Sequence, residues 1–250
     1  MKFTTGSSET VVNIPTRSML EDVVTARLAA GQGFALATLN LDHLVKLASD
    51  PAFRAAYKAQ DFVVADGNPI VWLSRLARQP VDLMPGSDMV VPLCALAQKA
   101  GQSVALVGTT DDSLRRAANA LQSAVPGLVI ACRIAPPFGF DPEGPEADTI
   151  LRTIAASGAR LCFVALGSPK QERFAARGRV MAPQVGFASV GAGLDFLSGS
   201  QTRAPRWVRQ LALEWLWRLL GQPRRLLARY LRCALILPGH TFDAMRKRFQ

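Results

Sequence analysis

The sequence predicts an α/β fold, with a Rossmann-like, doubly wound and mostly parallel sheet and a basic amphipathic helical appendage at the C-terminus. Two observations lead to this prediction. Short apolar runs alternate with longer amphipathic segments through residues 1–199, which is typical of strands and helices that follow one another in a parallel sheet. After Gly199 the chain becomes rich in Trp, Leu and Arg. We therefore expect an α/β domain over 1–199 and the appendage over 200–250.

Each element has its own signal. The apolar runs predict strands over 33–39, 62–65, 103–107, 128–132, 160–166 and 185–190. The amphipathic segments between them predict helices over 15–30, 42–59, 70–78, 87–100, 111–124, 145–157 and 170–180. Ser87, and either Asp111 or Asp112, stand where helix caps are expected. The Pro- and Gly-rich stretch 136–144 predicts a surface loop, with a lid as the alternative.

The appendage carries almost all of the net charge. Residues 203–250 contain 11 Lys and Arg against 2 Asp and Glu, a net of +9, whereas the whole chain has +10. Pro223 suits the first turn of a helix, and Arg225, Arg229 and Arg232 then recur on one face. This pattern is typical of a helix lying on an anionic membrane surface. The alternative is a helix packed on the domain with its arginines in water.

Composition narrows the class of protein and its compartment. With 49% hydrophobic and 19% charged residues, the chain is expected to be globular. No apolar run reaches 18 residues, so we expect no membrane-spanning helix, and the polar start predicts no secretory signal. The four cysteines form no CxxC pair, which favours reduced thiols in the cytoplasm.

Histidine is scarce, since the chain contains only His43 and His240. No Ser-His-Asp arrangement and no His or Cys metal-ligand spacing is present. Carboxylates, amides, hydroxyls and arginines must therefore carry any chemistry.

Asp66 is the strongest catalytic candidate. The apolar run 62–65 leads into Asp66-Gly67-Asn68-Pro69, as a buried strand does when it delivers a carboxylate to its C-terminal edge. Ligands of open α/β sheets bind beyond those edges. A carboxylate in such a half-buried place has its pKa raised by desolvation, which suits a general base. The competing interpretation is a plain Asp-Gly turn.

Polar residues end the run 33–39 in the same way. Thr38 and Asn40 lie two apart, so both point the same way at a strand end, and next to Asp66 if the two strands are neighbours. Hydroxyl and amide groups suit the hydroxyls of a sugar. Capping of the next helix by Asn40 is the structural alternative.

Two further glycine turns follow expected strands. In Gly167-Ser168-Pro169-Lys170-Gln171, the free N–H groups of a helix start favour a phosphate, and Lys170 and Gln171 would face the same crevice. A capping box from Ser168 to Gln171 is the alternative. In Gly191-Ala192-Gly193-Leu194-Asp195, Asp195 is placed to hold a ribose or a base edge. Together the polar turns suit a nucleotide with a polyhydroxyl partner.

These blocks resemble a known family. The chain holds, in order, Asp66-Gly67, Gly167-Ser168-Pro169-Lys170-Gln171-Glu172, Gly191-Ala192-Gly193-Leu194-Asp195, Arg203-Ala204-Pro205-Arg206-Trp207, Leu213-Glu214-Trp215-Leu216-Trp217-Arg218-Leu219 and Pro223-Arg224-Arg225. Over about 38–230 it resembles the WecG/TagA/CpsF family of bacterial glycosyltransferases, of the N-acetylmannosaminyltransferase type.

The resemblance implies an inverting hexosyltransferase that needs no cofactor and no metal. Its donor would be a UDP-sugar carrying N-acetylmannosamine, its uronic acid or glucose. Its acceptor would be a polyprenyl-diphosphate-linked saccharide of cell-surface or exopolysaccharide biosynthesis. The enzyme would sit peripherally on the cytoplasmic face of the inner membrane, with the appendage on the anionic surface and no nucleic acid as partner. An apolar stripe on the appendage would serve lipid or a homo-oligomer.

The resemblance also implies residue roles. Asp66 would be the base that deprotonates the acceptor. Donor contacts would come from Thr38, Asn40 and Gln171, with Asp195 in the nucleotide pocket. The appendage would close over the site, and Arg218, Arg224 and Arg225 would meet the diphosphate. The other candidates for substrate binding are Gly167, Lys170 and Arg203.

One segment departs from the family pattern, and two other functions compete. Leu83 and Met84 stand where family members often carry a basic residue before Gly86-Ser87-Asp88, so a donor contact there is in question. A nucleotide-dependent oxidoreductase would need a glycine fingerprint after the first strand, and 38–42 has no glycine. A non-enzymatic membrane- or nucleic-acid-binding module would explain the charged appendage but not the convergent polar turns.

Overall fold

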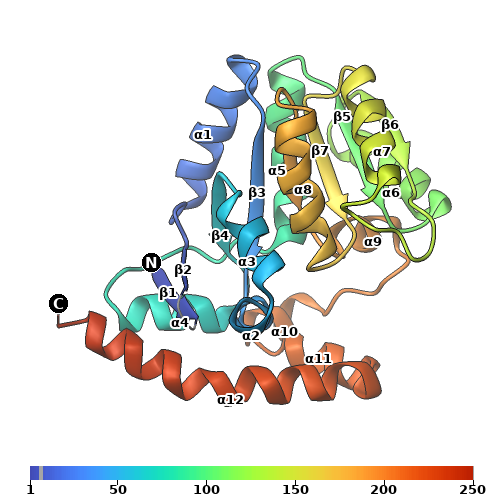
Figure 1. Cartoon of the computed structure of the whole chain (residues 1–250). Helices are drawn as coiled ribbons and strands as arrows, with labels where there is room; N and C mark the ends of the chain where they lie inside the picture. The colour runs from blue at the N-terminus through green and yellow to red at the C-terminus, as the bar shows by residue number, and fades with distance from the viewer. Residues whose placement is uncertain (6–7, 250) are drawn as a thin grey trace.

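The core is a six-stranded parallel sheet with strand order β4-β3-β8-β7-β5-β6. A computed structural model describes residues 1–5 and 8–249, and it leaves the side chains of Ser8 and Arg225 undescribed. The strands are β3 (Phe34–Leu39), β4 (Phe62–Ala65), β5 (Val104–Gly108), β6 (Ile130–Ile134), β7 (Leu161–Ala165) and β8 (Gly186–Ser189). This arrangement, with helices on both faces (Figure 1), confirms the predicted Rossmann-like fold class.

Helices connect the strands at nearly the predicted positions. They are α1 (Arg17–Ala29), α2 (Leu41–Ser49), α3 (Pro51–Lys58), α4 (Asn68–Leu76), α5 (Gly86–Lys99), α6 (Asp111–Ala124), α7 (Pro145–Ala156), α8 (Lys170–Met181) and α9 (Gly193–Ser198). The helix predicted over 42–59 is in fact two helices. Asp50 ends α2 and caps α3 by accepting a hydrogen bond from Phe53 N, and Pro51 starts the new helix.

The predicted caps of α5 and α6 were wrong by one or two positions. No described side chain caps α5, which begins at Gly86 after Pro85. Thr110 caps α6 by accepting from Ser113 N at 3.2 Å, so Asp111 and Asp112 occupy the first turn instead. Carboxylates in the first turn still stabilise the helix, because they face the positive end of its dipole.

The two faces of the sheet bury separate apolar layers. Side chains alternate along each strand, so Phe34, Leu36 and Phe163 pack toward α1, α5 and α6. Val164 and Phe187 point the other way, toward α7 and α8. Gly186 leaves room for the ring of its neighbour on β3, because a Cβ there would lie 2.5 Å from Cε1 of Phe34.

A short antiparallel hairpin, β1 (Lys2–Thr5) with β2 (Ser8–Val11), precedes the domain and was not predicted. Its sequence is polar, and only alternate residues of β1 are buried. Phe3 is its main apolar anchor, packing in the cluster beneath α2, α3 and α4.

The C-terminal ends of the strands form one continuous edge. β4, β3, β8 and β7 are consecutive neighbours, so the turns after them lie side by side. The crossover from β5 leads outward to β6, whereas the crossover from β7 leads the other way to β8. The switch point, where ligands of such sheets bind, therefore lies between the ends of β5 and β7.

The appendage crosses this edge and packs on the domain. It consists of α10 (Arg206–Gln210), α11 (Glu214–Gly221) and α12 (Pro223–Lys247), and Figure 1 shows α12 running below α2 and α4. Ala212, at φ 60°, separates α10 from α11. The inner face of α12 buries Leu226, Cys233 and Ala244. Its end contacts the hairpin, where Lys247 Nζ donates to the Lys2 carbonyl at 2.7 Å.

The outer face of α12 remains apolar and open. Leu227, Leu231 and Leu235 recur one turn apart and are 52%, 58% and 79% exposed. One face of α12 thus packs on the domain and another carries an exposed apolar stripe. Contact of this helix with a membrane surface stays a prediction. None of the described helices is long and apolar enough to cross a membrane.

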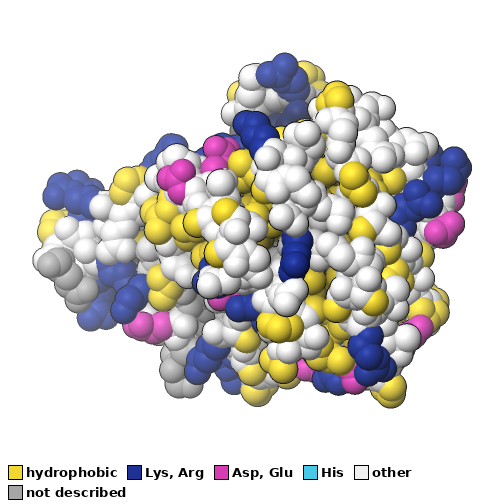
Figure 2. Space-filling view, turned by 90° about the horizontal axis from the view of Figure 1, so that it is seen from above, with side chains coloured by type: hydrophobic (Ala, Val, Ile, Leu, Met, Phe, Trp, Pro, Cys, Tyr) yellow, Lys and Arg dark blue, Asp and Glu magenta, His cyan; other side chains and the backbone are white. Residues whose placement is uncertain are grey.

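The side of the molecule that faces away from α12 carries charges of both signs. Figure 2, viewed from above, shows Lys and Arg in small groups interspersed with Asp, Glu and hydrophobic side chains. By sequence, nearly all of the excess positive charge lies in residues 203–250.

Candidate active site

Asp66 stands at the C-terminal end of β4, beside the end of β3. The backbone N–H of Asp66 donates to the Leu39 carbonyl at 2.8 Å, which extends the β3–β4 ladder by one step. Gly67 turns the chain away at φ 96°, and a Cβ on it would lie 3.9 Å from the Asn40 Cβ. The structure therefore brings Asp66 and Asn40 together, as the strand pairing required.

The surroundings of Asp66 suit a general base. Burial, and to a smaller extent the neighbouring Glu214 carboxylate, raise its pKa from 3.8 to about 6. A hydrogen bond from the Asn40 side chain, with Arg218 and Arg229 nearby, lowers the pKa and limits the rise. A carboxylate with a pKa near 6 is mostly deprotonated at neutral pH and is still basic enough to accept a proton from a substrate.

Asn40 performs two tasks at once. Its Oδ1 accepts from His43 N at 3.0 Å and so caps α2. This cap fixes the amide, and its Nδ2 is the group that remains for Asp66. The capping alternative is thus correct, and it holds Asn40 in place beside the carboxylate.

Thr38 lies deeper than expected. The residue is 4% exposed, and its carbonyl accepts from Tyr57 Oη at 2.6 Å, with His43 Nδ1 2.7 Å away. Burial lowers the pKa of His43 to about 3, so this histidine is neutral and structural. Thr38 is therefore firmly held behind Asn40, with little surface left for a ligand.

The turn after β7 differs from its prediction in two side chains. Gln171 was expected to face the crevice, but it is 3% exposed; its Nε2 donates to Glu172 Oε1 at 2.8 Å and its Oε1 accepts from Gly191 N at 3.0 Å. It ties the turns after β7 and β8 together. Lys170 is directed away, since its Nζ donates to the Phe140 carbonyl in the 136–144 loop at 2.7 Å.

The backbone of this turn remains accessible. Gly167 has φ 71°, and no described atom lies within 4 Å of a Cβ built on it. Ser168 forms no capping box, because α8 begins after Pro169 without a cap from any described side chain. This turn therefore offers a ligand mainly backbone groups.

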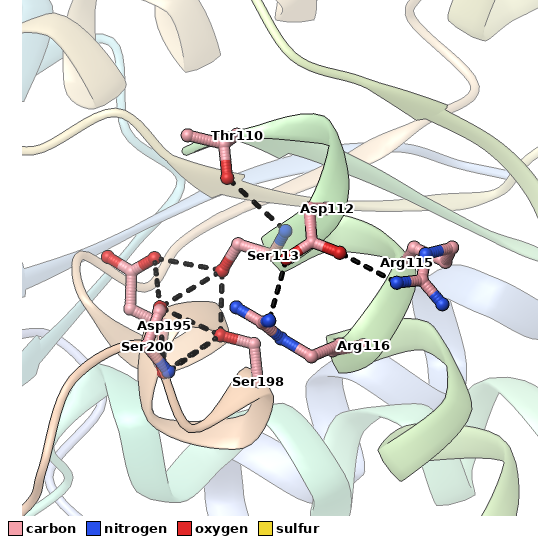
Figure 3. Close-up of polar contacts among 8 residues, drawn as sticks. All are labelled: Thr110, Asp112, Ser113, Arg115, Arg116, Asp195, Ser198 and Ser200. Carbon is pink, nitrogen blue, oxygen red and sulfur yellow. Dashed lines mark hydrogen bonds and ion pairs between the residues drawn. The ribbon is translucent and has the colours of Figure 1, made fainter.

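Asp195 is the centre of a hydrogen-bond network rather than a free carboxylate (Figure 3). Its Oδ1 accepts from Thr109 Oγ1 at 2.5 Å, from Ser200 Oγ at 3.2 Å and from Ser113 Oγ at 3.3 Å. Its Oδ2 accepts from Gln201 Nε2 at 2.9 Å. The expected contact to a ribose or base would have to share oxygens that already hold the β5 turn and the start of the appendage linker.

A family model decides what this arrangement belongs to. The model described as "Glycosyl transferase WecG/TagA/CpsF family" matches residues 9–250. The chain belongs to the WecG/TagA/CpsF glycosyltransferase family. It is therefore a transferase with a sugar donor and an acceptor, as the resemblance indicated.

The appendage of this glycosyltransferase reaches Asp66 with both signs of charge. Glu214 and Arg218 come from α11 and Arg229 from α12. Arg203, on the linker before α10, pairs with Asp88 of α5, and its guanidinium lies 5.8 Å from the Phe196 ring centroid. Arg224 is exposed, and the side chain of Arg225 lies outside the described residues.

The segment that departs from the family pattern is structural here. Met84 is fully buried in the core, and its N–H donates to the Ala65 carbonyl at 2.8 Å. Leu83 forms an isolated parallel bridge with Ala65. These residues support the end of β4 next to Asp66 and supply no cation to the site.

Sequence reasoning missed a second group of charged residues. Asp42 of α2 lies between Lys46 and Arg229, and Lys46 Nζ also donates to the Ser168 carbonyl at 3.1 Å. The i,i+4 spacing of Asp42 and Lys46 was visible, but the partner on α12 is 187 positions away and had no local signal. In the part of the chain that the structure describes, no group of three or more His, Cys, Asp or Glu could hold a metal ion.

Proposed function

We propose that this glycosyltransferase moves a hexose from a UDP-sugar to a polyprenyl-diphosphate-linked saccharide, with inversion, in cell-surface or exopolysaccharide biosynthesis. One observation carries the proposal. Asp66, with its pKa raised to about 6, stands at the C-terminal sheet edge, and Arg218 and Arg229 of the appendage act on it. A base and cations at one place are what acceptor deprotonation and departure of a diphosphate require.

In the proposed step, Asp66 takes the proton from the acceptor hydroxyl. The hydroxyl oxygen forms a bond to the anomeric carbon while the bond from that carbon to the diphosphate oxygen breaks. UDP leaves with the electron pair, and Asp66 ends the step protonated. Asn40 orients the carboxylate throughout, because its own amide is fixed by the cap on α2.

Arginines are proposed to meet the charge that develops on UDP. Arg218 and Arg203 lie close enough to Asp66 to interact with it electrostatically, so both border the site. A guanidinium presents a planar fork that fits phosphate oxygens. The reaction is accordingly proposed to need no divalent metal ion. N-Acetylmannosamine, its uronic acid and glucose are the proposed alternatives for the sugar.

The outer face of α12 is proposed to lie on the anionic cytoplasmic face of the inner membrane, where a polyprenyl acceptor is found. Leu227, Leu231 and Leu235 supply the apolar contact. Arg224 and Arg232 are exposed on the same helix and would face anionic headgroups. Exposed apolar groups beside cations favour such an interface.

The test is a thermal-shift panel of UDP and UDP-sugars in EDTA, followed by transfer to a lipid-linked acceptor. Wild type and Asp66→Asn should both be stabilised by UDP, while only wild type transfers sugar. Asp112→Asn is the control, because Asp112 is exposed on α6 and pairs with Arg115 and Arg116 of its own helix. No stabilisation by any UDP compound would instead refute a UDP-sugar as the donor.

A further inference from the structure

A half-buried ion-pair cluster joins the appendage to the domain at the seam between α12 and α2. Asp42, in the first turn of α2, has an 11% exposed side chain. Arg229 Nε lies 3.2 Å from its Oδ1, and Lys46 Nζ lies 2.7 Å from its Oδ2. One carboxylate therefore holds a cation from each of two elements.

This cluster connects three parts of the candidate site. Lys46 continues from Asp42 to the Ser168 carbonyl in the turn after β7, at 3.1 Å. On the other side, Arg229 interacts electrostatically with Asp66 at the end of β4. The position of α12 is thus linked through side chains to the base and to the glycine turn.

Arg229 lies on the face of α12 that packs on the domain. Leu226 and Cys233, three residues before it and four after it, are buried, and residues at this spacing share a helix face. The apolar contacts alone would tolerate small rotations or shifts of the helix. A displaced α12 would, however, leave the mostly buried Asp42 carboxylate with Lys46 as its remaining cation, and removing one partner from a buried charge cluster is unfavourable.

We propose that Asp42 and Arg229 are positioning residues, whose ion pair fixes α12 on α2 in one register and thereby sets the appendage over Asp66. The inference rests on the proposed function, because it assumes that Asp66 is the base. It assigns to Arg229 a task other than direct contact with the diphosphate.

Several other charged or titratable groups also face Asp66. They are Glu214 and Arg218 of α11, Arg203 of the linker and Tyr57 of α3. All of them remain when Arg229 is replaced. Loss of the Arg229 cation should raise the pKa of Asp66, whereas a lysine at position 229 should leave that pKa nearly unchanged.

The experiment uses the full chain with Asp42→Asn, Arg229→Gln, the double variant and Arg229→Lys. Arg246→Gln is the matched control, because Arg246 is an exposed arginine in the last turn of the same helix. Hydrogen exchange measures the protection of α12, and carboxyl NMR measures the titration of Asp66, both without ligand. The donor found in the UDP panel then gives kcat/KM.

Each single variant should lose protection in α12 and about tenfold in kcat/KM, and the double variant should lose no more than either, because the two residues act as one unit. Arg229→Gln should shift the Asp66 titration upward, while Arg229→Lys and Arg246→Gln should not. Losses that multiply in the double variant, or unchanged α12 protection and Asp66 titration, would overturn the inference. Full transfer activity in Asp66→Asn would instead refute the proposed function, whatever the α12 variants show.

Discussion

Replacing Asp66 with asparagine should make the protein more stable at pH 8, although it removes the proposed base. The pKa of Asp66 is raised in the fold from 3.8 to about 6, so the folded chain binds this proton more tightly than the unfolded chain. The stabilisation is complete below pH 3.8 and is lost as the pH rises through about 6. Above pH 6 the ionised carboxylate destabilises the folded chain, and a neutral asparagine side chain at this position removes that effect.

The magnitude follows from the shift in pKa. Each unit corresponds to about 1.4 kcal/mol, so a rise from 3.8 to about 6 gives an upper limit of about 3 kcal/mol at pH 8. Asp66 is only half-buried, and solvent screening together with a weaker bond to Asn40 will reduce this value. We expect a gain of about 1–2 kcal/mol in the free energy of unfolding, which disappears near pH 4.

Urea denaturation at pH 8 and pH 4 measures both values. Asp61→Asn is the informative control, because the Asp61 carboxylate accepts from Ala35 N at 2.8 Å and from Arg179 Nε at 2.7 Å. That variant should be destabilised at pH 8, opposite in sign to Asp66→Asn. If Asp66→Asn were also less stable than wild type at pH 8, Asp66 would be a folding residue and the electrostatic reasoning would be wrong.

Two further predictions concern charge and packing. Glu214→Gln removes an anion that raises the pKa of Asp66, so the acidic limb of kcat/KM against pH should move below about pH 6; an unchanged limb would exclude this coupling. Gly186→Ala places a Cβ 2.5 Å from the Phe34 ring and should cost about 1–3 kcal/mol or more in urea denaturation. Gly221→Ala, with no described atom within 4 Å of its Cβ position, should be nearly neutral.

Much of the fold was predictable because its signals are local. Apart from the edge strand β6, which includes the exposed Arg133, the strands of the sheet are short and mostly apolar runs, as in Phe62–Ala65, where each residue is buried. Buried parallel strands need no alternation, so these runs were recognisable directly. The hairpin was missed because β1 buries only alternate residues of a polar segment. The division of 42–59 was signalled by Asp50-Pro51, a cap followed by a first-turn proline.

The site was only partly predictable, since its side chains find partners far away in the sequence. Strand-end position correctly placed Asp66 beside Asn40, because neighbouring parallel strands end together. It could not show that the Gln171 side chain would be occupied by a hydrogen bond from Gly191 N. Nor could it show that Glu214 and Arg229 would reach Asp66, since that depends on how the appendage folds back.

The placement of the appendage changes how its charge should be understood. Part of its positive charge faces inward, where Arg203 pairs with Asp88 and Arg229 pairs with Asp42. The exposed leucines of α12 face away from these pairs on the same rigid helix. A helix seated by its inner face presents its outer face in one orientation only. The proposed contact with a membrane and the proposed completion of the site are therefore geometrically linked, and a change that unseats α12 should impair both.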